Sequence, residues 1–315
     1  MFRGPLFIVG APRSGTKLLR DLVKQHPAIG IPDYETEFLP RCLHLDFDLS
    51  QDFSRFYAWA TRFMYFKYMA EEGRLIQERT WREASPTMDL RGVFEGLCRH
   101  DAQQPEGVWG DKSPNYRNHL PELKRLFPEA RFVHIVRDGR DVCLSSHKAW
   151  GKHVLRNAQR WYDEVGACRQ AGQSLGEDYL EIRYEDLLAD PERWLGAIAQ
   201  HCGLAFDPAM LDPGRATENL GDTRGATGIV TDNSAKWKTR MEPKQLRRVE
   251  ALCAPLLTEL GYPLANPGVR HQRARAGEMM AWRLRDGAHL LRFRVKEWGW
   301  RDAVRYSISA LESTL

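Results

Sequence analysis

Short apolar runs alternate with amphipathic segments along most of the chain. Three short runs are strand candidates: residues 6–9, which are all apolar, residues 131–136, in which four of six residues are apolar or β-branched, and residues 179–184. Four segments place apolar residues at helical spacing: residues 16–25, 140–148, 192–202 and 243–260. Strands that alternate with helices predict βαβ units, and therefore an α/β fold with a central parallel sheet flanked by helices.

An aromatic-rich segment separates the first two strand–helix units. Its large apolar residues follow the i, i+3, i+4, i+7 spacing of a helix: Phe53, Phe56, Tyr57, Ala60, Phe63 and Met64. This spacing predicts a stripe that faces the core; the alternative is a lid or the wall of a binding pocket. We expect a main domain over residues 1–269 with a helical insertion at about 41–105, followed by a separate extension over residues 270–315.

The composition narrows the class of protein. The chain has 315 residues, of which 43% are hydrophobic and 28% charged, with a formal net charge of +4. These values exclude a wholly disordered chain, and we expect neither a membrane span nor a signal peptide. The six cysteines form no C-x-x-C pair, so we expect reduced thiols and no metal site. The sequence thus predicts a globular protein of the cytoplasm.

The turn after the first strand carries the strongest chemical signal. Residues 10–17 read GAPRSGTK and stand where backbone N–H groups at a helix N-terminus form an anion site. Arg13, Ser14 and Thr16 add donors suited to a phosphate-like group; the alternative is an ordinary turn. A Walker A loop needs lysine directly after its second glycine, but Thr16 stands there and Lys17 comes one residue late. This disfavours ATP or GTP hydrolysis and leaves a kinase variant open.

The turn after the second strand offers another anion site. Arg137 ends this strand, and Ser145 lies eight residues later in the expected helix. A strand–turn–helix can bring these two side chains to one phosphate. The alternative is a surface arginine that pairs with Asp138 or Asp141.

Two anion sites on one parallel sheet match a nucleotide with a 5′-phosphosulfate and a 3′-phosphate. Here the sequence resembles the sulfotransferases that use 3′-phosphoadenosine-5′-phosphosulfate (PAPS). Five segments carry the resemblance in the family's order, over about residues 5–262: residues 12–16, residues 111–114, the pair Arg137 and Ser145, residues 184–187, and residues 234–237. The resemblance implies a P-loop-like sulfotransferase fold, PAPS as the donor, and sulfation of an acceptor.

The resemblance also implies roles for individual residues. Arg13 and Lys112 would stabilise charge on the sulfuryl and bridging oxygens during an in-line displacement. The five segments supply the expected nucleotide-binding residues: Arg13, Ser14, Gly15, Thr16, Lys17, Arg137, Ser145, Tyr184, Ser234 and Lys236.

The catalytic base is expected on the loop after the first helix. The motif style is closest to the tyrosylprotein and bacterial or carbohydrate branch, where a His-Pro follows this helix, as His26 and Pro27 do here. Pro114 occupies the place of the histidine base of the small-molecule branch. The tyrosylprotein branch has a glutamate followed by threonine just beyond the His-Pro, which indicates Glu35. One inserted residue leaves Glu37 as the alternative, and two solvated loop glutamates are a third interpretation.

For the acceptor we expect a hydroxyl of a saccharide, lipid or natural product, or an amine. Sulfation of secreted-pathway protein tyrosines is disfavoured by the lack of a leader or anchor in the sequence. The rival functions are an ATP-dependent kinase of the same fold and a nucleotide-binding protein without catalysis. Nucleic-acid binding is disfavoured because residues 1–269 hold 36 basic and 37 acidic residues.

The excess positive charge lies in residues 270–315, which hold ten basic and five acidic residues. The segment also carries five aromatic residues: Trp282, Phe293, Trp298, Trp300 and Tyr306. Residues 291–296 alternate apolar and basic, which fits a basic strand or part of an amphipathic helix. We interpret the segment as a packed extension; the alternatives are contact with a partner helix, a second copy, an anionic acceptor or a membrane surface.

Overall fold

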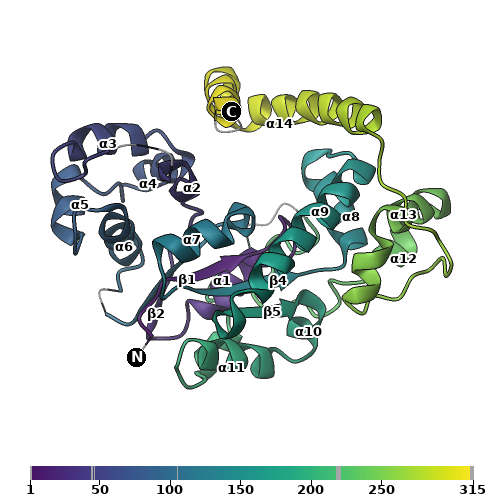
Figure 1. Ribbon diagram of the computed structural model, residues 1–315, viewed down its shortest axis with the longest axis horizontal. Helices are drawn as coiled ribbons and strands as arrows, with labels where there is room; N and C mark the ends of the chain where they lie inside the picture. Colours follow the sequence, from purple (N-terminus) through teal and green to yellow (C-terminus); the bar gives the residue numbers. More distant parts are fainter. Residues whose placement is uncertain (1, 44, 46, 105, 218–220, 313–315) are drawn as a thin grey trace. The chain divides into compact units, whose positions relative to one another are not determined.

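The computed structural model describes residues 2–43, 45, 47–104, 106–217 and 221–312 (Figure 1). Within these residues, five strands form one sheet in the order β2-β3-β1-β4-β5, and every neighbouring pair is parallel. The strands are β1 Leu6–Val9, β2 Ile29–Gly30, β3 Val108–Lys112, β4 Arg131–Val136 and β5 Tyr179–Arg183. The carboxyl ends of parallel strands meet at one edge of the sheet, where α/β proteins bind their ligands.

Helices make up most of the remaining described chain. They are α1 Thr16–Val23, α2 Leu39–Cys42, α3 Phe53–Ala60, α4 Met64–Glu71, α5 Glu78–Ala84, α6 Leu90–Asp101, α7 Leu120–Leu126, α8 Gly139–Trp150, α9 Val154–Gln173, α10 Tyr184–Ala189, α11 Pro191–His201, α12 Trp237–Arg240, α13 Pro243–Glu259 and α14 Ala276–Glu312. Short 3₁₀ helices span Pro114–Asn118, Gly176–Asp178 and Pro208–Leu211.

The central strand β1 is buried on both faces, because successive side chains of a strand point to opposite sides. Leu6 and Ile8 belong to a core formed with apolar residues of α1, α10 and α11. Phe7 and Val9 belong to a second core formed with α3 to α7. A strand buried on both faces is a continuous apolar run, which is why this one can be read from the sequence.

The aromatic segment after β2 packs as a helical group, α2 to α6 (Figure 1). Phe53, Phe56 and Ala60 are fully buried, as their spacing predicts, but the helix ends after Ala60 and a second one starts at Met64. Trp81 of α5 contacts both phenylalanines, with ring centroids 5.7 Å and 5.5 Å away. The aromatic stripe is therefore core.

The chain divides into two compact units, each made of separate segments. Unit 1 consists of Met1–Val136, Ala167–Thr217 and Gly225–Thr231, and it contains the sheet. Unit 2 consists of Arg137–Gly166, Glu218–Arg224 and Asp232–Leu315. The division into domain and extension at residue 269 stays a prediction.

The expected strands and helices appear close to their predicted bounds, and the α/β class is confirmed. The pattern did not reveal strands β2 and β3 or the long helix α9. Strand β3 was missed because Gly110, Asp111 and Lys112 interrupt its apolar character. Residues 291–296 lie in α14 and are helical, so the alternative of a basic strand is wrong. All six cysteines are buried and form no disulfide.

Candidate active site

The turn between β1 and α1 forms the core of the site in unit 1. The backbone N–H of Ser14 donates to the backbone carbonyl of Ala11 at 3.0 Å, and this hydrogen bond closes the turn. Ser14 is fully buried, and its Oγ has no hydrogen-bond partner within the described chain. Arg13 has a positive φ of 76°, which is uncommon for a residue other than glycine. A buried hydroxyl without a protein partner fits an anion bound in the turn.

Gly15 cannot carry a side chain in this turn. Its φ is +100°, and an added Cβ would lie 2.4 Å from Cδ2 of Tyr184. Tyr184 begins α10 after β5 and is 3% exposed. Tyr184, which begins the segment 184–187 of the family resemblance, thus packs directly on the expected phosphate loop.

Lys112 lies at the end of β3, beside this loop. It pairs in register with Ile8 of β1, one residue before the end of that strand. Its side chain is 1% exposed, and its Nζ donates to Oε1 of Glu35 at 2.5 Å. The expected cation and the expected base, 77 residues apart in sequence, are therefore in direct contact.

Burial and neighbouring charges set the pKa values of this pair. Burial lowers the pKa of Lys112 to about 8; Arg20 and Lys17 also lower it, and Glu35 opposes them. Burial would raise the pKa of Glu35, but the charge and hydrogen bond of Lys112, with Lys17 and Arg20, bring it below its ordinary value. Glu35 is therefore ionised at neutral pH, and Lys112 can lose its proton at mildly alkaline pH.

Glu37 differs from Glu35 in both contacts and basicity. Burial raises the pKa of Glu37 to about 7, and the negative charge of Glu35 contributes. Its carboxylate accepts from Asn115 Nδ2 at 3.2 Å, and its backbone N–H donates to Ser113 Oγ at 3.2 Å. Both candidate bases thus lie within one loop, with different protonation near neutral pH.

A buried network ties this loop to β3. Thr36 Oγ1 donates to Asp111 Oδ2 at 2.7 Å and shares a hydrogen bond of 2.8 Å with Tyr116 Oη. Ser113 Oγ donates to the same Asp111 oxygen at 2.8 Å. Because Thr36 follows Glu35 and Asp111 precedes Lys112, this network fixes the two reactive side chains relative to each other.

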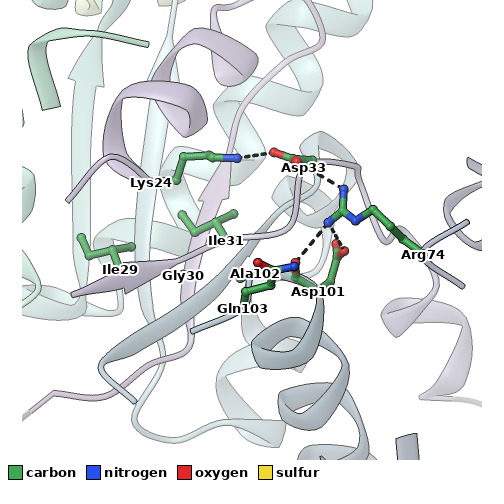
Figure 2. Close-up of a pocket in the computed structure, with 9 residues that line it drawn as sticks. All are labelled: Lys24, Ile29, Gly30, Ile31, Asp33, Arg74, Asp101, Ala102 and Gln103. Atoms are coloured by element: carbon green, nitrogen blue, oxygen red, sulfur yellow. Dashed lines mark hydrogen bonds and ion pairs between the residues drawn. The ribbon is translucent and has the colours of Figure 1, made fainter. Parts of the chain in front are cut away.

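A pocket of 310 Å³ lies at the start of this loop, beside edge strand β2 (Figure 2). Its charged side chains are paired with one another: Lys24 contacts Asp33, and Arg74 Nη2 donates to Asp101 Oδ1 at 2.7 Å. Arg74 also lies 3.6 Å from Asp33. The pocket walls thereby hold Asp33, two residues before Glu35, in place.

Unit 2 contains the second expected anion site. Arg137 is 6% exposed, and its Nη2 donates to the backbone carbonyl of Asn233 at 2.6 Å. Its Nη2 lies 3.9 Å from Asp141, which also accepts from the backbone N–H of Trp237 at 2.9 Å. Ser145 is half-buried on α8. Arg137 is therefore not an exposed surface arginine, and its partner Asn233 directly precedes residues 234–237, one of the five segments of the resemblance.

Lys236 has a carboxylate partner in unit 2. Its Nζ donates to Asp222 Oδ2 at 2.7 Å, and Lys148 and Arg240 contact the same carboxylate. Ser234, two residues before Lys236, is half-buried. Asp222 thus anchors the segment around Lys236 to α8.

Several contributors to the site were not assigned a role from the sequence. Thr36, Asp111 and Ser113 stand inside the motifs that were singled out, so adjacency to Glu35 and Lys112 could have marked them. Arg20 and Tyr68 gave no signal, since a helical arginine and an aromatic residue in an apolar stripe are ordinary. The side chains of Trp298 and Tyr306 lie outside those that the structure describes.

The sulfotransferase family model matches residues 5–208, about two thirds of the chain. The chain belongs to this family. It is therefore a sulfotransferase rather than an ATP-dependent kinase or a nucleotide-binding protein without catalysis.

Protein-tyrosine sulfotransferases of animals match this sulfotransferase over most of its length. The protein-tyrosine sulfotransferase 1 of Danio rerio is 25% identical over 286 residues, which cover 83% of this chain and 73% of that protein. The human protein-tyrosine sulfotransferase 1 is 26% identical over 287 residues, which cover 83% and 70%. The expected likeness to the tyrosylprotein branch is confirmed.

Two solved structures confirm the P-loop-like sulfotransferase fold. The sulfotransferase domain from the curacin biosynthetic pathway aligns with a TM-score of 0.57 at 22% identity, covering 83% of this chain and 99% of that domain. The domain from the Synechococcus PCC 7002 olefin synthase aligns with a TM-score of 0.54 at 23% identity, covering 81% and 95%.

The expected cytoplasmic location is wrong. The matching relatives are named for the sulfation of protein tyrosine, a reaction of the secretory pathway, and this contradicts the expectation. Among the residues placed in the structure, no helix is both long and apolar enough to span a membrane.

Proposed function

We propose that this sulfotransferase moves the sulfuryl group of PAPS to an acceptor hydroxyl, with Glu35 as the base. The contact of 2.5 Å between Glu35 Oε1 and Lys112 Nζ carries the proposal. It joins a carboxylate that is ionised at neutral pH to a buried cation, next to a loop suited to an anion. In-line transfer of a charged group needs these two functions at one place.

The proposed donor-binding residues are those of the five segments that carry the family resemblance, taken for each unit by itself. In unit 1, the loop groups of Arg13, Ser14, Gly15, Thr16 and Lys17 bind the 5′ end of the nucleotide, and Tyr184 lies beside the adenine. In unit 2, Arg137 and Ser145 bind the 3′-phosphate, and Ser234 and Lys236 close over the nucleotide. PAPS supplies the activated sulfuryl group. No residue of this proposal requires a metal ion.

The reaction step follows from the charges of unit 1. Glu35 accepts the acceptor's proton while the acceptor oxygen bonds to sulfur and the bond from sulfur to the 5′-phosphate oxygen breaks. Arg13 and Lys112 stabilise the charge that builds on the sulfuryl and bridging oxygens. When Lys112 turns to these oxygens, Glu35 loses its partner and becomes more basic.

The surroundings of the carboxylates favour an acceptor with an apolar body. Tyr34 and Tyr68 stack with ring centroids 5.0 Å apart. Burial raises the pKa of Tyr68, and Glu71, Glu35 and Glu37 contribute, so this ring lies near both candidate bases. We propose a lipid or natural-product hydroxyl ahead of a saccharide or an amine. Protein tyrosine is a second candidate acceptor, because the relatives that match 83% of the chain are named for it.

The test combines an acceptor screen with two matched variants. The enzyme is incubated with sulfur-labelled PAPS and lipid, natural-product, saccharide, amine and tyrosyl-peptide acceptors, and products are identified by mass spectrometry. With the acceptor found, Glu35→Gln should lower kcat about 10²- to 10⁴-fold, since that is what a general base contributes. Glu37→Gln should lower kcat by less than about tenfold, because Glu37 is not the proposed base.

The pH profile separates the two glutamates independently. A base must be deprotonated, so kcat/KM falls as the pH drops through its pKa. With Glu35 as the base, kcat/KM stays constant as the pH falls to 4.5, the ordinary pKa of a glutamate, because the pKa of Glu35 lies below that value. A loss of kcat/KM below about pH 7, which disappears in Glu37→Gln, would assign the role to Glu37. Failure of every acceptor with PAPS would overturn the proposed reaction itself.

A further inference from the structure

One face of α14 is anchored within unit 2. Asp286 is 3% exposed; it accepts from the backbone N–H of His153 at 2.6 Å and from Arg156 Nη1 at 2.8 Å. One helical turn earlier, Trp282 stacks on the His153 ring, with centroids 4.8 Å apart and planes at 14°. His289 lies against Gly151 at the end of α8. The helix is therefore fixed to unit 2 along this face.

The opposite face of α14 presents apolar side chains to solvent. Met280 is 55% exposed and Leu284 is 70% exposed. Three further residues continue the same line at spacings of three or four, namely Ala288, Leu291 and Val295, and they are exposed or half-buried. We call these five residues the outer stripe. Soluble surfaces rarely carry such a continuous apolar line without a partner.

Cations border the outer stripe on both sides. By helical position, Arg283 lies along one edge, and Arg285, Arg292 and Lys296 lie along the other. All four are exposed.

Two acidic residues of the same stretch, Asp286 and Glu278, have partners outside this border. Asp286 is bound to Arg156 and the backbone of His153. Glu278 accepts from the backbone N–H of Arg275 at 2.8 Å and lies 3.4 Å from Arg248. The outer stripe thus has an apolar centre and positive edges.

We propose that the outer stripe docks on the surface of an anionic lipid bilayer. The helix would lie in the plane of the interface, with Leu284 and Leu291 among the acyl chains and the cations on the lipid phosphates. A second copy of the chain would bring positive edges against positive edges, which is repulsive. A neutral apolar partner would leave the cations without a counter-charge. An anionic bilayer satisfies both the stripe and its border.

The end of the straight part of α14 fits this arrangement. Gly299, with φ 78° and ψ 166°, interrupts the helix, and Trp300 follows with 65% exposure. Figure 1 shows the change of direction near the C-terminal end of α14. Tryptophan prefers the headgroup level of a bilayer, where its ring is partly apolar and partly polar.

Vesicle sedimentation with the purified full chain tests the proposal. The protein should bind vesicles of phosphatidylglycerol mixed with phosphatidylcholine at least about tenfold better than phosphatidylcholine alone, and added salt should weaken this binding. The double variant Leu284→Ser with Leu291→Ser should lose binding about tenfold or more. The triple variant Arg283→Gln, Arg292→Gln and Lys296→Gln should lose a similar factor for anionic vesicles only.

Matched controls lie away from α14. Arg79→Gln and Arg125→Gln remove cations that are 89% and 76% exposed, and Leu211→Ser removes an apolar side chain that is 37% exposed. Their binding should equal that of the unchanged protein, and thermal unfolding checks that every variant is folded. Equal binding to neutral and anionic vesicles, or equal loss in control and α14 variants, would overturn the proposal. A dimer seen by light scattering that Leu284→Ser dissolves would instead assign the stripe to a second copy. None of these readouts depends on sulfuryl transfer.

Discussion

Lys112 and the cations of α14 carry the same charge in opposite surroundings. The Lys112 side chain is 1% exposed, and a single carboxylate oxygen lies 2.5 Å from its Nζ. Arg283, Arg285 and Arg292 are exposed along a surface helix. A buried charge interacts strongly with a partner at a defined distance, because the interior has a low dielectric constant. Each exposed charge interacts only weakly, so exposed charges have a large effect only when several act together.

The comparison shows why net charge alone does not locate function here. The excess of basic residues lies in residues 270–315, but the chemistry is proposed for side chains within residues 1–269, which hold 36 basic and 37 acidic residues. A few cations at strand ends can serve catalysis when each has a defined partner. A larger number around an apolar stripe can serve adhesion without any defined partner.

The largest expected effect comes from removing the buried cation. Lys112→Met keeps the length of the side chain but removes its charge, and kcat should fall about 10²- to 10³-fold, as for a lost charge-stabilising donor. Nucleotide affinity, measured by calorimetry with the desulfonated 3′,5′-bisphosphate nucleotide, should change much less. Lys112→Arg is the matched control and should recover part of the rate. A loss of affinity as large as the loss of kcat would show that Lys112 acts in binding.

Much of the fold could be predicted because its central strands are buried on both faces. Leu6–Val9 is a continuous apolar run and Arg131–Val136 is mostly apolar, with Arg131 and His134 as its polar residues, and both match the observed strands. Strand β3 was not predicted, because its end carries Asp111 and Lys112. These polar residues stand in a strand because the site needs them at its carboxyl end, and tertiary contacts override their weak β-propensity.

The site could be predicted residue by residue but not as a set of contacts. Spacing and family resemblance indicated Arg13, Glu35 and Lys112, yet no pattern could show that Glu35 and Lys112 touch. That contact depends on two chain segments that meet only through the sheet, and on the bond from Thr36 to Asp111. The cations of α14 gave a compositional signal, but only the helix showed that they border an apolar stripe.

An intermediate effect is expected from pH. Lys112 must be an ammonium ion to stabilise charge, and burial lowers its pKa to about 8. As the pH rises through this value the cation is lost, so kcat/KM should fall by about tenfold per pH unit above it. An exposed lysine would keep its charge to a much higher pH. Initial rates across the alkaline range, with the acceptor found in the screen, measure this limb.

Lys112→Arg provides the control for this pH limb, because arginine stays charged throughout the accessible range. Its kcat/KM should be lower than that of the unchanged enzyme near neutral pH but should remain constant above pH 8. If the same alkaline limb persists in Lys112→Arg, another group titrates there. The lowered pKa of Lys112 would then not explain the alkaline fall of kcat/KM.

The smallest expected effect concerns the network that positions the pair. Thr36→Val keeps the shape of the side chain but removes the hydroxyl that donates to Asp111 at 2.7 Å and bonds Tyr116 at 2.8 Å. The buried partners lose a hydrogen bond, which should lower the free energy of unfolding by about 1–3 kcal/mol. Because Glu35 is then held less well, kcat should fall about tenfold, with the alkaline limb of kcat/KM unchanged.

Thr36→Ser separates positioning from simple loss of stability, since it keeps the hydroxyl but removes a buried methyl group. Denaturant unfolding and kcat are measured for both variants at the same temperature. If positioning matters, Thr36→Ser loses some stability but keeps nearly all of its kcat, whereas Thr36→Val loses both. Equal kcat in the two variants would mean that the Glu35–Lys112 contact holds the loop by itself. The hydrogen bonds of Thr36 would then not be needed to position Glu35 and Lys112. Lys112 would differ from the cations of α14 only in its burial.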